Sequence, residues 1–443
     1  MKHYCRAVLL LLLLISLLRC NSPQHTSAKP SCTDISRVIT RMTELMIHDV
    51  TNPPLAARFF AYACLAGHEV VAQNNSRITS MHGVLNSYPL IVKPDSIETY
   101  DYQLAALLAM LETAKKMQPS GKLLNAFQDH LIDSFRHAGY TDAVIAGSGS
   151  YARTISKQIL AYAKSDGYNK ISNLPRYTPL QKEGCWYPTP PAYISAVEPY
   201  FKTVRPFTLD SSSQFKPLPP EPYSANRQSI FYRDMLLKNY AETDSSPELH
   251  RLIAGFWDCN PFAVQDEGHL SVGLKKISPG AHWLGITGIA CMKAKKNFDE
   301  AMDITTIVAL GLTDSFIACW DEKYRSNRIR PETAIRQLLD VNWKPLLQTP
   351  PFPEYLSGHS CISATSATIL THYFGDHFHY TDSVELNYGL APRTFNSFQE
   401  AAIEAGISRF YGGIHFMDAI NNGRAQGLKV GDWVLQKIKG KKS

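Results

Sequence analysis

The chain has 443 residues, of which 44% are hydrophobic and 19% are charged. These proportions are those of a globular protein, and they exclude a disordered chain or a coiled coil. The formal net charge is +6, but removal of residues 1–19, which hold Lys2, Arg6 and Arg19, would leave +3. So small an excess does not indicate a nucleic-acid partner.

The N-terminus carries the pattern of an export signal. A basic start precedes residues 7–18, which are apolar except for one serine; this run is too short to span a bilayer but fits a signal-peptide core. We therefore predict that residues 1–19 are a signal peptide and that the protein is exported to the periplasm or outer surface. Cys20 stands where a lipoprotein cysteine would carry a lipid anchor, although Arg19 replaces the usual small residue. Cleavage after Ala28 is the alternative.

Helical periodicity dominates the N-terminal region, residues 30–174. It predicts helices over residues 54–73, 101–117, 122–138 and 141–165. The texture then changes, because prolines and aromatics cluster from residue 175 to 223 and no period persists. We assign residues 175–245 to a proline-rich connection, since a loop this long in a compact protein is usually functional or joins two lobes.

Helical patterns return in the C-terminal domain, residues 246–440. They predict helices over residues 247–257, 281–296 and 297–317, with a continuation that would place Lys323 and Arg330 on one face, about 10 Å apart. Pro331 would stop that helix. A further helix would open at Ser357, and another would run from 406 to 418. The expected fold is all-α, as one bundle or two lobes, with the functional site in the C-terminal half.

Three short motifs lie within 93 residues of one another in this domain. They are Lys323-x6-Arg330-Pro331, then Ser357-Gly358-His359, then Ser408-Arg409-x5-His415. Any one of them has a plain structural explanation, such as a solvated helix face, a helix N-cap or a turn histidine. Nine specified positions in this order, however, should arise by chance in only about one in ten thousand chains or fewer.

The motifs supply the groups that bind a tetrahedral oxyanion. Lys323, Arg330 and Arg409 can neutralise oxyanion oxygens, and a serine hydroxyl with a glycine amide adds directional donors. If residue 357 caps a helix, the helix amides and the positive end of its dipole face the anion. One histidine can then attack or ligate the central atom while the other moves protons.

At these residues the chain resembles the vanadium-dependent haloperoxidases, the type 2 phosphatidic acid phosphatases and the bacterial class A acid phosphatases. Their shared pattern is Lys-x6-Arg-Pro, Pro-Ser-Gly-His and Ser-Arg-x5-His followed closely by Asp. This chain departs from it in two places. Leu356 replaces the proline before Ser357, and Asp418 comes three residues after His415 where many members have it after four. The role of Asp418 as the partner of His415 Nδ1 therefore stays open.

The resemblance implies a role for each residue. Lys323, Arg330, Ser357, Gly358 and Arg409 would bind the oxygens of vanadate or phosphate. His415 would be the axial vanadium ligand or the phosphoryl nucleophile, and His359 the acid–base residue opposite it, with Asp418 as the third catalytic residue.

Two branches of this superfamily remain open. The haloperoxidase branch would use vanadate to oxidise halide with hydrogen peroxide, and Trp320 and Phe352 favour it because such aromatics line the halide pocket of its chloride-oxidising members. The alternative is hydrolysis of phosphomonoesters through a phosphohistidine at His415. The lipid phosphatases are built from several membrane-spanning helices, which this sequence does not predict.

The cysteines predict no disulfide framework. Beyond Cys5 and Cys20 there are seven, widely scattered, without a Cys-x-x-Cys pair or another metal-ligand spacing. Cys64, Cys291 and Cys319 lie in apolar helical runs and are expected to be small core residues.

Overall fold

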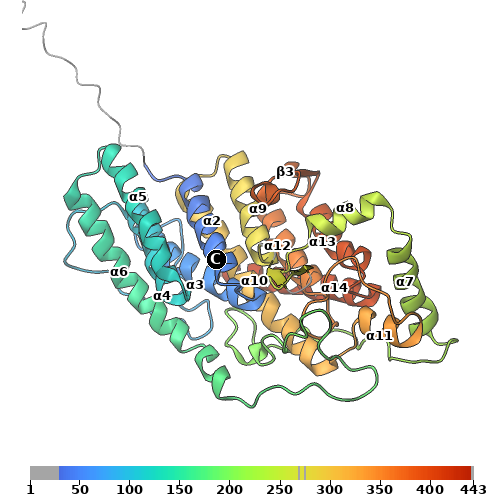
Figure 1. The fold of residues 1–443 in the computed structure, drawn as a ribbon. Coiled ribbons are helices and arrows are strands. Elements are labelled where there is room, and N and C mark those ends of the chain that lie inside the picture. The colour runs from blue at the N-terminus through green and yellow to red at the C-terminus, as the bar shows by residue number, and fades with distance from the viewer. Residues whose placement is uncertain (1–28, 268–269, 274–275, 441–443) are drawn as a thin grey trace, which may run out of the picture.

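The computed structural model describes residues 29–440, except 268–269 and 274–275. The predicted signal peptide and Cys20 lie outside the described residues. Thirteen α-helices form the described part of the chain, with two small two-stranded sheets. The all-α prediction is therefore confirmed. Figure 1 shows α4, α5 and α6 at one end of the molecule, α7 at the other, and α10 and α12 between them.

The helices of the N-terminal half match the predicted segments closely, with one addition that the sequence analysis missed, α2. Their bounds are α2 Cys32–His48, α3 Pro53–Ala72, α4 Tyr102–Met117, α5 Leu124–His137 and α6 Asp142–Lys164. Polar side chains fix where several of them begin: Asn52, Asp101 and Thr141 each accept a backbone N–H of the first turn, as helix N-caps do.

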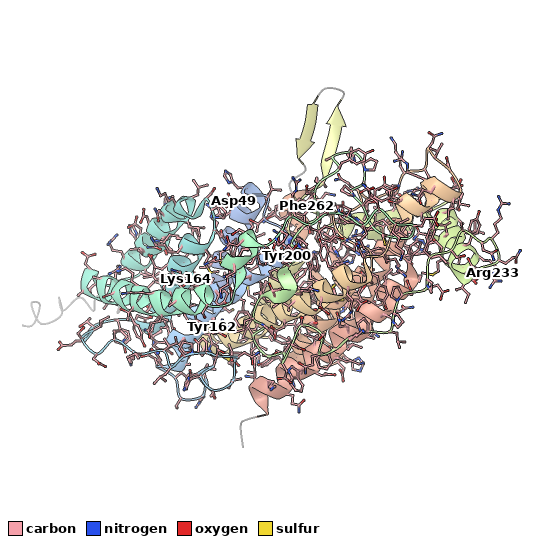
Figure 2. All side chains as sticks on the ribbon, turned by 90° about the horizontal axis from the view of Figure 1, so that it is seen from below. Asp49, Tyr162, Lys164, Tyr200, Arg233 and Phe262 are labelled. Atoms are coloured by element: carbon pink, nitrogen blue, oxygen red, sulfur yellow. The ribbon has the colours of Figure 1, made fainter. Side chains whose placement is uncertain are left out.

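The remaining elements follow an irregular segment that reaches a π-helical turn at Phe231–Leu236. They are α7 Leu237–Asp244, α8 Glu248–Phe256, β1 Val264–Glu267, β2 Leu270–Gly273, α9 Pro279–Lys293, α10 Phe298–Ser326, α11 Pro331–Leu338, α12 Gly358–Phe374, β3 Tyr380–Asp382, the 3-10 turn η5 Val384–Tyr388, β4 Arg393–Phe395, α13 Phe398–Tyr411 and α14 Met417–Lys439. Both strand pairs are antiparallel. The β1–β2 hairpin stands out from the helical body near Phe262 (Figure 2).

The central element is α10, which is buried along almost all of its length. Asn297 and Glu300 form a reciprocal capping box at its start, and the helix packs against α3, α9, α12 and α14. Helices α3 and α10 are long and apolar enough to cross a membrane, but 89% and 100% of their most apolar windows are buried inside the protein. They are core helices.

One hydrophobic core joins the two halves of the chain. It contains residues from Ile35 on α2 to Ile438 on α14, so the N-terminal helices pack directly on the C-terminal ones. Close helix contacts occur at small residues: a Cβ added to Gly427 on α14 would lie 2.1 Å from the Cys361 carbonyl oxygen on α12. Glycine at that position lets α14 and α12 approach closely.

The proline-rich segment is anchored on α10. The buried carboxylate of Asp314 accepts hydrogen bonds from the backbone N–H groups of Phe207 (2.6 Å) and Thr208 (2.7 Å). The Val197 carbonyl accepts from Trp320 Nε1 at 3.2 Å. These contacts place the irregular segment beside the part of α10 that carries Lys323.

Two predicted helix boundaries were wrong. Helix α10 ends at Ser326 because Asn327 adopts a left-handed conformation (φ 50°), which asparagine tolerates better than most residues. Arg330 therefore does not share a helix face with Lys323; it is the extended residue before α11, and Pro331 starts that helix instead of ending one.

The second wrong boundary concerns residues 406–418. Helix α13 ends at Tyr411, and Gly413 turns the chain with φ 72°. His415 consequently lies in the loop before α14, not one turn beyond Arg409 on a common helix.

Candidate active site

Six of the predicted site residues line one cavity in the C-terminal half, whereas Lys323, Arg330, Ser357 and Asp418 are not among its lining residues. Its lining includes Trp320, Phe352, Gly358, His359, Arg409 and His415, which come from α10, the segment before α12, α12, α13 and the loop before α14. The chain reversals at Asn327 and Gly413 bring these separate segments together.

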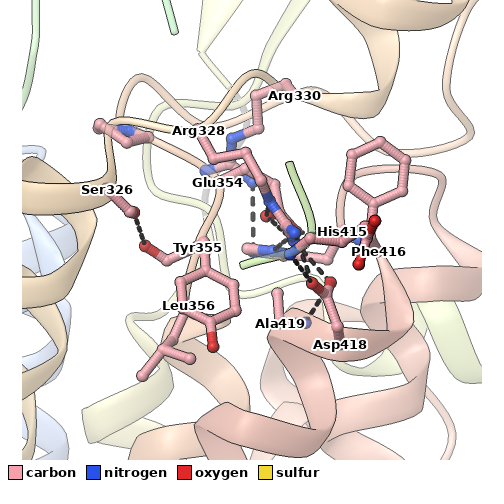
Figure 3. Close-up of polar contacts among 12 residues, drawn as sticks. Ser326, Arg328, Arg330, Glu354, Tyr355, Leu356, His415, Phe416, Asp418 and Ala419 are labelled. Atoms are coloured by element: carbon pink, nitrogen blue, oxygen red, sulfur yellow. Dashed lines mark hydrogen bonds and ion pairs between the residues drawn. The ribbon is translucent and has the colours of Figure 1, made fainter. Parts of the chain in front are cut away.

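His415 is held in one orientation by a carboxylate that the sequence analysis did not identify. Its Nδ1 lies 2.9 Å from Glu354 Oε1, and its Nε2 lies 3.2 Å from Arg330 Nη1 (Figure 3). Because a guanidinium only donates, Nε2 accepts and the ring proton is on Nδ1, where it is donated to Glu354. Burial, followed by the charges of Arg330 and Lys323, holds the pKa of His415 well below its usual range. The ring is neutral at physiological pH, with its lone pair on Nε2.

The sequence left open whether Asp418 orients His415. In the structure the partner of His415 Nδ1 is Glu354, and no hydrogen bond or ion pair joins Asp418 to that ring among the described residues. Asp418 forms a two-bonded ion pair with Arg328, at 2.5 Å and 2.7 Å, and Arg328 Nε also donates to Glu354 Oε2 at 2.6 Å. Asp418 therefore acts on His415 indirectly. It fixes Arg328, and Arg328 in turn fixes Glu354. Asp418 lies in the first turn of α14 while His415 precedes that helix, which explains why closeness in sequence did not give contact.

Two sequence signals could have pointed to these missed residues. Glu354 is the one carboxylate in the otherwise uncharged stretch between Thr349 and Ser357, and Arg328 repeats the charge of Arg330 two residues earlier. Neither belongs to the motifs, and both are almost fully buried.

Arg330 is a buried cation with a hydrogen-bonding group to spare. Its Nε donates to the Phe352 carbonyl at 3.0 Å and its Nη1 to the Ile414 carbonyl at 2.8 Å. Its Nη2 is buried and has no hydrogen-bond partner among the described residues. Burial lowers the pKa of Arg330 to about 10, which still leaves the guanidinium charged at neutral pH.

Arg409 and His359 form a second pair across the cavity. Arg409 Nη1 lies 3.0 Å from His359 Nε2 and also donates to the Trp257 carbonyl. Its Nε and Nη2 are buried without hydrogen-bond partners in the described part of the chain, and Nη2 has only a loose ion pair with Asp258, at 3.8 Å. Burial and the charge of Arg409 hold the pKa of His359 well below its usual range, so this ring is a neutral proton acceptor.

Lys323 lies behind the cavity and its donors are occupied. Its Nζ donates to the carbonyls of Pro353 (2.9 Å), Glu354 (3.2 Å) and Leu356. These bonds fix the segment that carries Glu354, and the carbonyl at 356 serves whether that residue is leucine or proline. Burial lowers the pKa of Lys323 to about 8. The ammonium is therefore close to its titration point under mildly alkaline conditions.

The start of α12 faces the cavity as predicted. Ser357 is the N-cap, and its hydroxyl oxygen accepts from the Ser360 N–H and the Ser360 hydroxyl, which leaves its own proton available. The first amides of a helix, here beginning at Gly358, have no partner within the helix. They add the positive end of the helix dipole to the cavity.

The two predicted aromatic residues form one wall. The rings of Trp320 and Phe352 lie 5.0 Å apart, and both line the cavity. Lys323 Nζ lies 4.9 Å from the Phe352 ring centre, and this lysine packs on the wall without being among the residues that line the cavity. All seven cysteines in the described residues are free, and Cys64, Cys291 and Cys319 are buried as predicted.

Comparisons with known proteins point to the same family as the sequence motifs. Residues 303–441 match the family model described as the second helical-bundle domain of VCPO. A crystal structure titled as the first bacterial vanadium-dependent iodoperoxidase is 41% identical, with a TM-score of 0.86 over 92% of this chain and 97% of that one. A search of curated proteins found no match.

More distant structures share the fold. The holo and apo forms of a bacterial vanadium-dependent chloroperoxidase are 16% and 15% identical, with TM-scores of 0.66 and 0.64 over 88% of this chain and 93% and 95% of theirs. With 41% identity to the iodoperoxidase over nearly the full length of both chains, this chain belongs to the vanadium-dependent haloperoxidases.

Proposed function

We propose that this enzyme binds vanadate in the cavity and uses hydrogen peroxide to oxidise halide. The halide that we expect it to oxidise is iodide. The observation that carries the proposal is the 41% identity to a vanadium-dependent iodoperoxidase over 92% of the chain. The arrangement of His415, Arg330 and Arg409 supports it independently.

The residues present fit vanadate. Arg330 Nη2, Arg409 Nε and Arg409 Nη2 are buried donors without hydrogen-bond partners in the described structure, and each such group costs about 1–3 kcal/mol when unpaired. A tetrahedral oxyanion would satisfy these donors, with further hydrogen bonds from Ser357 and Gly358. His415 Nε2 carries a lone pair that would bind the vanadium. Bound vanadate supplies a Lewis acid that activates hydrogen peroxide.

His359 would move the protons of the reaction. The overall change, X⁻ + H₂O₂ + H⁺ → HOX + H₂O, consumes one proton, and a neutral imidazole in the cavity can accept a proton from peroxide and return it to the leaving oxygen. Its contact with Arg409 keeps the ring beside the site of oxyanion binding. Trp320 and Phe352 would partly desolvate the halide and so raise its reactivity.

The test is reconstitution of the purified protein with orthovanadate, followed by assays with iodide, bromide and chloride at saturating hydrogen peroxide. We expect vanadate-dependent oxidation of iodide, lost in His415→Ala. A parallel assay with a phosphomonoester and no vanadate examines the alternative, in which His415 Nε2 attacks phosphorus. Phosphatase turnover with trapped phosphohistidine, and no oxidation of any halide, would overturn the proposal.

We also propose that the protein is exported through residues 1–19. The test of export is to determine the N-terminus of protein recovered outside the cytoplasm. A lipid-modified Cys20 would establish an anchored protein, and a start at Lys29 would establish cleavage after Ala28. Intact Met1 in a cytoplasmic protein would contradict export.

A further inference from the structure

A second cluster of buried polar side chains lies next to the active site. It consists of Cys259 in the loop after α8, His282 on α9 and Glu385 in η5, with Asp382 at the end of β3 behind the imidazole. At most 5% of any of these residues is exposed. The function described above uses none of them.

The three donor atoms are spaced as ligands of one metal ion. His282 Nδ1 lies 3.6 Å from Cys259 Sγ and 3.3 Å from Glu385 Oε1, and the sulfur and the carboxylate oxygen are 3.7 Å apart. Tetrahedral zinc with bonds of about 2.3 Å to sulfur and about 2.0–2.2 Å to nitrogen and oxygen separates its ligands by about 3.3–3.6 Å. The observed separations of 3.3, 3.6 and 3.7 Å match this range to within about 0.1 Å.

The group behind the imidazole completes the pattern. Asp382 Oδ2 lies 2.8 Å from His282 Nε2, so the proton on Nε2 is donated to the carboxylate. In the neutral ring the Nδ1 lone pair would then face Cys259 and Glu385. Metal-ligating histidines usually have such a carboxylate or carbonyl on their other nitrogen. The Trp257 ring stacks on the imidazole at 4.7 Å and shields it from solvent.

From these contacts we propose that Cys259, His282 and Glu385 bind a divalent zinc ion, with Asp382 fixing the tautomer of His282. Cys259 also lines the cavity that holds His359 and Arg409, and a solvent molecule from that cavity would supply the fourth ligand. The ion would join the loop after α8, α9 and η5 at the edge of the active site. This proposal does not depend on which halide the enzyme oxidises.

The same contacts have a metal-free alternative. Burial opposes a charge on His282, but Asp382 raises its pKa well above the usual range, so a buried imidazolium could bridge Asp382 and Glu385. Burial raises the pKa of Cys259 to about 11, which would keep it a thiol in that state. Zinc would displace the thiol proton, and the two states therefore differ in metal content and in the charge on sulfur.

The experiment uses the full chain purified without a metal-affinity tag, stripped with a chelator and reloaded with Zn²⁺ or Co²⁺. We expect one metal ion per chain and, with Co²⁺, a near-ultraviolet sulfur-to-cobalt charge-transfer band. Cys259→Ser should abolish the band. Cys291→Ser, which removes another buried cysteine, on the same helix as His282, should retain it. Absence of metal from the reloaded wild type, or a band that survives Cys259→Ser, would overturn the proposal.

A second measurement needs no variant. Because a ligand that binds only the folded state stabilises it, Zn²⁺ should raise the Tm of the stripped wild-type protein, and chelator should reverse the rise. An unchanged Tm over a Zn²⁺ titration would contradict the site. Adding orthovanadate before the titration should leave the metal stoichiometry at one, because none of the three proposed zinc ligands is a proposed vanadate-binding residue.

Discussion

Two buried arginines in this molecule, Arg58 in the N-terminal half and Arg409 in the C-terminal half, are almost equally inaccessible, at 5% and 1% exposed. Arg58 Nε donates to Asp166 at 2.6 Å, its Nη2 donates to the Ala163 carbonyl at 3.1 Å, and its guanidinium lies over the Tyr168 ring. Arg409 instead keeps Nε and Nη2 without hydrogen-bond partners in the described residues.

The difference distinguishes a buried charge that supports the fold from a buried charge that binds a ligand. A buried cation with a full set of partners stabilises the fold only as part of its network, and removing it leaves the partner carboxylate uncompensated. A buried cation with unused donors costs stability and is retained where it binds something from outside. The comparison therefore predicts opposite outcomes for the two arginines.

The largest effect is expected from Arg58→Gln. It leaves Asp166 buried without its cation, so the free energy of unfolding should fall by about 3–5 kcal/mol. Chemical denaturation monitored by circular dichroism measures this, and calorimetry should show vanadate affinity within about twofold of wild type. A large loss of vanadate affinity in the folded variant would show that Arg58 is not purely structural.

The matched change Arg409→Gln should reverse the pattern. Vanadate affinity should fall by about 100-fold or more, as when one partner of a buried charge pair is removed. The Tm should stay equal or rise, because a buried charge with two unused donors is gone. The same calorimetry and thermal unfolding measure both quantities. A loss of stability as large as that of Arg58→Gln would break the comparison.

A smaller effect is expected from Glu354→Gln, because Glu354 acts through His415. Vanadate affinity should fall by about 10- to 100-fold, the usual range for a group that orients a metal ligand. Asp418→Asn is the matched control, since Asp418 touches Arg328 but not His415, and its effect should be smaller. Equal effects of the two variants would mean that the whole ion-pair network, and not the Glu354 contact with Nδ1, fixes the ring.

The fold and the active site also show how much could be predicted from the sequence. Periodicity predicted most helices. The motifs predicted that six residues would meet around one anion-sized cavity: Lys323, Arg330, Ser357, His359, Arg409 and His415. Of these, His359, Arg409 and His415 line the cavity directly. The path of the chain between motifs was not predictable, because it depends on left-handed turns at Asn327 and Gly413, which no hydrophobic period records.

Long-range polar partners were equally hidden. Glu354 lies 61 residues before His415, and the cysteine, histidine and glutamate of the proposed zinc site are separated by 23 and 103 residues. Their convergence follows from the packing of α9, α12 and α13. Local spacing carries no signal for such contacts.

The smallest expected effect concerns Lys323 and pH. Burial lowers its pKa to about 8, so the free enzyme has a charged ammonium below that pH and loses the charge as pH rises through it. The ratio of the vanadate affinities of wild type and Lys323→Met should therefore decline as pH rises above 8. Taking the ratio cancels the ionisation of vanadate itself. A ratio that stays constant from pH 6 to 10 would exclude an electrostatic contribution from Lys323.

The most direct test of the anion site is a crystal structure of the protein soaked in orthovanadate, with vanadium located by anomalous scattering. We predict one vanadium bonded to His415 Nε2, with its oxygens on Arg330 Nη2 and on Arg409. Vanadium bonded to His359, or bound only outside this cavity, would contradict the assignment of unused buried donors to anion binding.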